Sequence, residues 1–110
     1  MNIRKMIKPS LLLIEGIIVI LLYYSLVVMH ENAHAQTLRY FGVSSEFRYS
    51  WGFPVATVPT DVAAPMSDES WRMVNGLNAM NDIFFYQFQV VYIFFAVIFL
   101  LMSILIIGMI

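Results

Sequence analysis

Three residues in one short stretch have the types and the spacing needed for metal chemistry. Residues 30 to 34 read HENAH, so His30 and His34 lie four positions apart with Glu31 between them. On an α-helix, residues four apart project from nearly the same face, and two imidazoles placed in this way can bind one ion. Glu31 could then act as general base on a water molecule held by that ion. The stretch matches the H-E-x-x-H pattern of metallopeptidases.

The rest of the sequence offers little other reactive chemistry. The chain has no cysteine, which excludes disulfides, thiolate metal sites and a cysteine nucleophile. The net charge is −1 and the six basic residues are scattered, so no nucleic-acid-binding surface is expected. The two motif histidines are the only histidines in the chain. An alternative interpretation is that they cap or pack the end of a helix without binding a metal.

Two apolar runs dominate the sequence, which is 61% hydrophobic and only 12% charged. The first run, Leu11 to Met29, is interrupted only by Glu15. As a helix it would cover roughly 28 Å, close to the ~30 Å thickness of the hydrocarbon layer of a bilayer. The second run, Ile83 to Ile110, has no charged residue and is long enough to span with tilt. The pattern predicts a mainly α membrane protein with two transmembrane helices.

The residues around the first run bear on its orientation in the membrane and on whether it is cleaved as a signal peptide. Arg4, Lys5 and Lys8 precede it, and by the positive-inside rule they favour a cytoplasmic N-terminus. This basic start and the A-x-A-like sequence at residues 33–35 also resemble a signal peptide. The apolar run exceeds the about 7–15 residues usual in signal peptides, so we expect a retained helix.

We expect residues 1–110 to form a single membrane domain. The first transmembrane helix should cover about residues 11–41, include the motif and end at Gly42 as a C-terminal cap. Residues 43–66 should form an interfacial strand and loop region. Aromatic and polar residues alternate in its first part, which predicts a hairpin or two short strands.

The second half of the chain should begin with a loop and continue as helix. The loop is expected over residues 60–66, and Ser67 is a natural N-cap because Asp68 follows it in the first helical turn. An amphipathic helix over residues 67–82 should then lead into the transmembrane helix at residues 83–110.

A third metal ligand is expected from the second helix. A catalytic zinc usually has three protein ligands and an open position for water. The first apolar run ends near His30 and the second begins near Ile83, so in a helical hairpin both ends lie at the same membrane face. Asp82 is therefore the expected third ligand, and an interfacial charge without a ligand role is the alternative. Asn78, one turn earlier, and Asn75 are expected to orient a ligand or bind substrate.

Two other acidic residues, Glu15 and Asp61, have different expected roles. Glu15 lies roughly 22 Å along the helix from His30, too far to bind the same metal, and we expect it to act in assembly. Asp61 is a weaker alternative to Asp82 as third ligand. Histidine and carboxylate ligands do not separate zinc from copper, so zinc is expected and copper is not excluded.

The stretch HENAHAQTLRYFGV followed by SSEFRYSWGFPVATVP resembles the intramembrane zinc metalloproteases of the site-2 protease type. In that family a membrane helix carries H-E-x-x-H, usually followed by alanine, and ends in an F/L-G-V-like sequence. The matching positions are His30, Glu31, His34, Ala35, Gly42 and Val43. An extended segment comes next in the family and is thought to present substrate as a strand. The resemblance covers about Leu21 to Thr60.

The second half departs from the family pattern. There the third ligand is an aspartate in an Asp-Gly motif preceded by Asn and Pro, on a later membrane helix. Residues 78 to 83 read NAMNDI, without the proline or the glycine, and the span that normally intervenes is missing. The assignment of Asp82 therefore rests on geometry rather than on the resemblance.

The leading hypothesis is a minimal intramembrane zinc metalloprotease that hydrolyses membrane-associated substrates with metal-activated water. Residues 43–59 would guide an unwound substrate helix. The alternative is a small noncatalytic subunit of a larger membrane complex, with or without a metal. The expected partners are the lipid bilayer together with either a membrane protein substrate or partner subunits, in an oligomer or complex.

Overall fold

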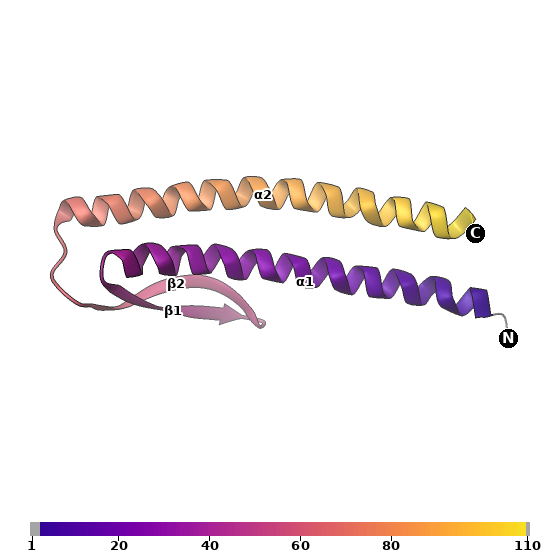
Figure 1. Ribbon diagram of the computed structural model, residues 1–110, viewed down its shortest axis with the longest axis horizontal. Helices are drawn as coiled ribbons and strands as arrows, with labels where there is room; N and C mark the ends of the chain where they lie inside the picture. Colours follow the sequence, from indigo (N-terminus) through magenta and orange to yellow (C-terminus); the bar gives the residue numbers. More distant parts are fainter. Residues whose placement is uncertain (1–2, 110) are drawn as a thin grey trace. The chain divides into compact units, whose positions relative to one another are not determined.

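The chain folds into two long helices joined by a β-hairpin. In this computed structural model the elements follow in the order α1 (Ile3–Tyr40), β1 (Val43–Ser50), β2 (Phe53–Val62) and α2 (Asp68–Met109) (Figure 1). The two strands pair antiparallel in one two-stranded sheet. The prediction of a mostly helical chain with a strand segment between two apolar helices is confirmed.

The structure describes the backbone of residues 3–109 and the side chains of residues 8–108. The side chains of Arg4 and Lys5, on which the predicted orientation partly depends, lie outside the described residues. So does Ile110, the predicted end of the second span.

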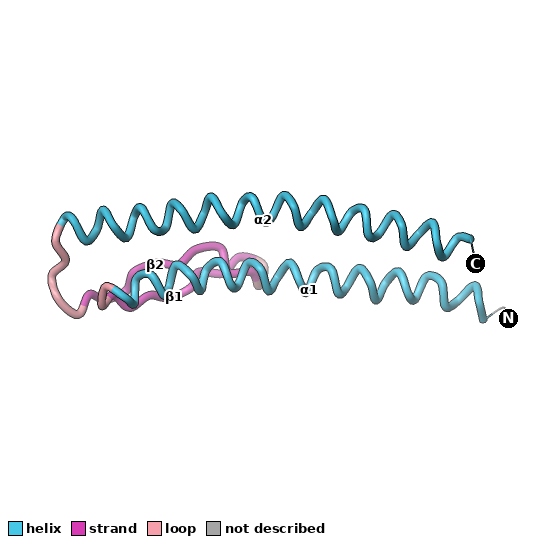
Figure 2. Tube along the Cα trace, turned by 45° about the horizontal axis from the view of Figure 1, so that its top comes forward, coloured by secondary structure: helices cyan, strands magenta, loops and turns pink. Residues whose placement is uncertain are grey.

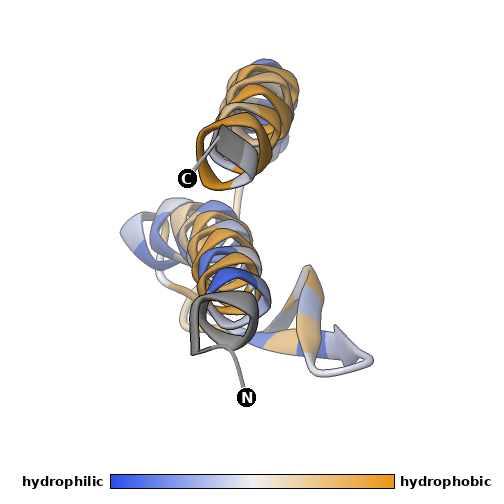
Figure 3. Ribbon diagram, turned by 90° about the vertical axis from the view of Figure 1, so that its right-hand side faces the viewer, coloured by the Kyte–Doolittle hydropathy of each residue, from blue (hydrophilic) through white to orange (hydrophobic). Residues whose placement is uncertain are grey.

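Both helices contain a segment long and apolar enough to cross a membrane, Lys8–Tyr40 in α1 and Asp68–Gly108 in α2. The helices have 38 and 42 residues, which correspond to about 57 and 63 Å. Hydrophobic residues predominate along both, as the orange ribbons of Figure 3 show. Large apolar side chains such as Leu13 and Phe88 are about two-thirds exposed within the chain itself. Surfaces of this kind mark contact with a membrane or with other proteins.

The strands run further than the sequence indicated. The predicted loop over residues 60–66 is wrong in its first part, because β2 continues to Val62, which pairs with Val43. Pro59 does not end the strand, because the register shifts beside it and leaves Thr60 opposite no residue of β1. A second shift beside Pro54 has the same form. Such bulges accommodate proline in a strand, since the chain there forgoes regular ladder bonds.

The helix ends and the turn follow local rules. Gly42 has a φ of 77°, and its amide donates to the Arg39 carbonyl at 2.9 Å, which confirms the predicted C-terminal cap of α1. The amide of Ser70 donates to Ser67 Oγ at 3.1 Å, so Ser67 caps the start of α2 as predicted. Trp51 and Gly52 both have positive φ, the backbone that a two-residue hairpin turn requires.

The chain divides into two compact units. Unit 1 comprises Met1–Tyr23 and Phe88–Ile110, and unit 2 comprises Tyr24–Gln87. In unit 1, polar side chains join the two helices. Gln89 Nε2 donates to Tyr23 Oη at 2.6 Å, and Tyr92 donates to the carbonyl of Val19. Interhelical hydrogen bonds of this kind in apolar surroundings contribute about 0.6–2 kcal/mol each.

Unit 2 has a small core that anchors the hairpin to both helices. Leu38, Val43 and Val74 are almost fully buried and bring together α1, β1 and α2. The amide of Ala63, just after β2, donates to the Gly42 carbonyl at 3.0 Å. The hairpin therefore folds back along the last turns of α1 (Figure 2).

Replacement of Gly42 by alanine should lower the free energy of unfolding by about 1–2 kcal/mol, because an L-residue is strained at this positive φ. The added Cβ would lie 3.7 Å from Ala63 Cβ, an ordinary contact, so the cost is conformational rather than steric. Gly76→Ala is the matched control. Gly76 lies inside α2 with nothing near its Cβ position, so alanine should stabilise by about 0.5–1 kcal/mol. Denaturant titration followed by circular dichroism tests both, and equal effects would contradict the assignment.

Candidate metal centre

Three side chains of unit 2 direct one ligand atom each toward a common point. His30 and His34 project from one face of α1, and Asp82 projects from α2. The Nε2 atoms of the two histidines are 3.3 Å apart. Asp82 Oδ1 lies 2.8 Å from His34 Nε2 and 3.1 Å from His30 Nε2. The structure thus brings together the three residues that the sequence predicts as ligands.

The hydrogen bond between His34 Nδ1 and Asn78 determines which ring nitrogen of His34 is free to act as a ligand. His34 Nδ1 lies 2.8 Å from Asn78 Oδ1, and an amide oxygen only accepts, so Nδ1 carries a proton. A neutral His34 therefore presents a bare Nε2 to the carboxylate oxygen of Asp82. Two lone pairs at 2.8 Å repel each other unless a proton or a metal cation lies between them. A proton can bridge one pair, whereas a metal cation satisfies all three ligand atoms at once.

The spacing of the three atoms suits a small divalent ion such as zinc. With bonds of about 2.0–2.1 Å, ligand atoms at tetrahedral angles are separated by about 3.3–3.4 Å. The 3.3 Å between the two histidine nitrogens agrees with this value, and both distances to Asp82 are shorter. Asp82 would have to move outward by a few tenths of an ångström. Its side chain is 44% exposed, so it has room to do so.

The surroundings of His30 differ from those of His34. Its ring stacks on Phe85, with ring centroids 4.0 Å apart, and its Nδ1 is buried without a hydrogen-bond partner among the described residues. Asn81 Nδ2 donates to the His30 backbone carbonyl at 3.3 Å. The orientation of the His30 ring is therefore set by stacking on Phe85, whereas that of the His34 ring is set by Asn78.

Among the residues whose side chains are described, Glu31 is the one acidic residue that is buried, with a residue exposure of 6%. Thr57 of β2 donates from Oγ1 to Glu31 Oε2 at 2.6 Å and also lies 2.9 Å from the Glu31 carbonyl oxygen. The other carboxylate oxygen, Oε1, is 3.9 Å from His30 Nε2. Glu31 therefore has one oxygen held by the hairpin and the other beside the three ligand atoms.

An open cavity of about 340 Å³ adjoins these groups. Its lining is mostly polar and comes from α1, β2 and α2. The lining residues are His30, Glu31, His34, Val55, Ala56, Thr57, Asn78, Asp82 and Tyr86. Three ligand atoms on one side and an open cavity on the other leave room for water and for a further molecule.

The remaining predicted site residues lie elsewhere. Asn75 is exposed and does not line the cavity. Asp61 is exposed near the end of β2, where its Oδ1 accepts from the amide of Val62, and it is not one of the three clustered ligands. Glu15 accepts a hydrogen bond from Ser103 within unit 1.

Sequence reasoning missed Thr57, Asn81 and Phe85. Phe85 lies three residues after Asp82, so the helical spacing from Asn78 through Asp82 could have indicated it. Thr57 had no such signal, because its contact with Glu31 joins residues 26 apart and depends on how the hairpin folds.

Comparisons with known proteins give no relative: no family model, no curated protein and no solved structure matches this chain.

Protein purified without added metal should contain close to one zinc ion per chain, and His34→Ala should contain none. Asn78→Ala should weaken zinc binding by about 10–100-fold, because His34 loses the group that orients it. Asn75→Ala is the matched control and should bind like the parent, since Asn75 is exposed outside the cavity. Mass spectrometry and competition with a chelator measure both quantities. A parent protein without metal, even after incubation with zinc, would contradict the site.

Thr57→Val should lower the free energy of unfolding by about 1.5–3 kcal/mol, because the buried Glu31 carboxylate loses a donor. Thr57→Ser keeps the hydroxyl group and should recover most of the loss. Thr60→Val, at an exposed position of the same strand, is the control for a change of hydroxyl to methyl. Parallel denaturant titrations test this prediction. Equal losses in the free energy of unfolding for Thr57→Val and Thr60→Val would show that the contact does not stabilise the fold.

Proposed function

We propose that this chain is a minimal intramembrane zinc metalloprotease. His30, His34 and Asp82 hold the zinc ion, and Glu31 acts as general base. The observation that carries the proposal is the arrangement of three converging ligand atoms beside a buried carboxylate and an open cavity. Structural zinc sites are usually closed by four protein ligands, whereas catalytic sites keep a position open for water. The open arrangement supports hydrolysis over the noncatalytic subunit considered from the sequence.

The two helices support the proposed membrane location. Each is apolar enough to span a bilayer, and the apolar runs end next to His30 in α1 and begin next to Asp82 in α2. The proposed centre therefore lies at the boundary between the hydrocarbon layer and water, where both water and a membrane-embedded substrate have access. The basic residues before the first run favour a cytoplasmic N-terminus.

In the proposed reaction the zinc ion, Glu31 and Asn78 have separate roles. Zinc at this site would supply a water molecule of lowered pKa and polarise the substrate carbonyl. Glu31 takes the proton from that water through Oε1, because Oε2 is engaged by Thr57. The same carboxyl group then gives the proton to the departing amine, as general acid. Asn78 keeps the proton of His34 on Nδ1, so that Nε2 stays available as a ligand atom.

An extended peptide suits the cavity better than a helix. Val55, Ala56 and Thr57 of β2 line it together with Glu31 and the three ligand residues. Within the described residues β2 pairs only with β1, so its other edge has no strand partner there. An extended substrate segment could form main-chain hydrogen bonds with that edge. In a helix the same peptide groups are already bonded to one another. The proposed substrates are therefore membrane-protein segments that unwind near the interface.

Glu31→Gln should abolish hydrolysis and retain the metal. A general base contributes about 10²–10⁴-fold to rate, so activity should fall at least about 100-fold while zinc content stays at the parent level. Glu46→Gln is the matched control, since Glu46 is exposed on β1. The assay incubates purified protein in vesicles with a panel of single-span membrane proteins and identifies new termini by mass spectrometry. Equal cleavage by parent and Glu31→Gln protein would rule out this mechanism.

A further inference from the structure

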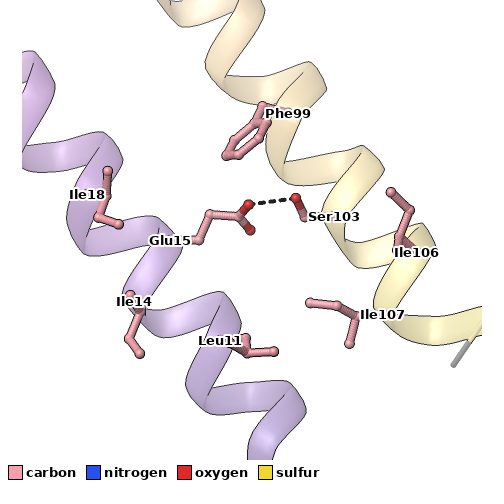
Figure 4. Close-up of a pocket in the computed structure, with 8 residues that line it drawn as sticks. All are labelled: Leu11, Ile14, Glu15, Ile18, Phe99, Ser103, Ile106 and Ile107. Carbon is pink, nitrogen blue, oxygen red and sulfur yellow. Dashed lines mark hydrogen bonds between the residues drawn. The ribbon is translucent and has the colours of Figure 1, made fainter.

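A carboxylate in unit 1 lies in a second cavity that shares no residue with the metal centre. The cavity has a volume of about 400 Å³ and is open on one side. Glu15 projects from α1 into it, toward Ser103 of α2 (Figure 4). The remaining walls are apolar and consist of Leu11, Ile14, Ile18, Phe99, Ile106 and Ile107.

Glu15 has too few partners for these surroundings. Ser103 Oγ donates to Glu15 Oε1 at 2.6 Å. Among the described residues no other hydrogen bond to this carboxylate is found, and no lysine or arginine forms an ion pair with it. An ionised carboxylate has about four acceptor positions. An acidic group in an apolar environment is costly unless a cation or further donors satisfy it.

The described part of this chain supplies no cation to Glu15. The apolar runs of this chain, residues 11–29 and 83–108, contain no lysine or arginine. A second copy of the chain therefore offers no basic side chain at the depth of Glu15. In α1 that depth is four residues, or about 6 Å, inside the first apolar run.

The length of the cavity along α1 and α2 suits contact with a third helix. On α1 its walls extend from Leu11 to Ile18, and on α2 from Phe99 to Ile107, which is about 10–12 Å on each helix. Two helices that lie side by side present a groove into which a third helix packs, at an axial separation of about 8–10 Å. A lysine or arginine from that helix would reach the open side of the Glu15 carboxylate.

We propose that the groove around Glu15 and Ser103 binds a transmembrane helix of another protein, one that carries a lysine or arginine at the depth of Glu15. The proposal rests on the proposed membrane insertion and is independent of zinc binding and proteolysis. The basic side chain neutralises Glu15, and apolar side chains of the same helix fill the space between the isoleucines. This surface gives the chain a partner of defined chemistry, either a substrate or a companion subunit.

The test uses synthetic transmembrane helices of leucine and alanine as probes, with energy transfer to labelled full-length protein in vesicles of neutral lipid. One probe has a lysine at the fifth apolar position, a second has leucine there, and a third has its lysine at the opposite end. The lysine probe should bind about tenfold more tightly than the other two, equivalent to about 1.4 kcal/mol. Glu15→Gln should reduce this preference to less than about twofold.

Three further variants keep the result interpretable. Ser103→Ala retains the carboxylate and should keep the preference for lysine. Glu15→Lys should reverse it, so that a probe with glutamate at the fifth position binds best. Glu31→Gln should bind all probes like the parent, which separates this surface from the proposed activity. Resistance to alkaline extraction establishes insertion separately. Equal binding of the lysine and leucine probes, or a preference that survives Glu15→Gln, would overturn the proposal.

Discussion

The convergence of three atoms that could bind one metal ion is the constraint around which the candidate site of unit 2 is arranged. His30 and His34 approach each other because they occupy neighbouring turns of α1, and Asp82 reaches them from α2. Unless a proton or a metal cation lies between them, His34 Nε2 and Asp82 Oδ1 set lone pairs against each other at 2.8 Å. A metal ion that joins α1 to α2 here would stabilise the fold of unit 2 as well as supply reactivity, because ligands on two helices are brought together only in the folded chain.

The groups around the ligands restrict what each can do. Asn78 fixes the proton of His34, and Thr57 holds one oxygen of Glu31 while the other remains beside the ligand atoms. The hairpin is therefore part of the site. The two bulges beside its prolines shift the pairing of β2 with β1, and bulges commonly re-aim side chains next to functional sites.

Unit 1 uses polar groups in a different way. Its two helix segments carry few polar residues, and those that the structure describes mostly contact the other helix, as Tyr23 does with Gln89 and Glu15 with Ser103. In an apolar environment each such contact orients one helix about its axis, because turning it outward would expose a polar group to hydrocarbon. The surplus charge of Glu15 is the exception, and it distinguishes one face of the helix pair from the others.

Local spacing in the sequence determined the two long helices, the caps at Gly42 and Ser67, the presence of the hairpin and the shared face of His30 and His34. Asp82 was also predictable, because both apolar runs end at the same level in a helical hairpin. Only the tertiary structure decided that β2 extends to Val62, that Thr57 contacts Glu31, that Phe85 stacks on His30 and that Asn75 lies outside the cavity. The physical reason is the separation along the chain of the residues that interact. Helical periodicity and caps are set within a few residues, whereas the hairpin contacts depend on strand register, bulges and packing between segments far apart in the chain.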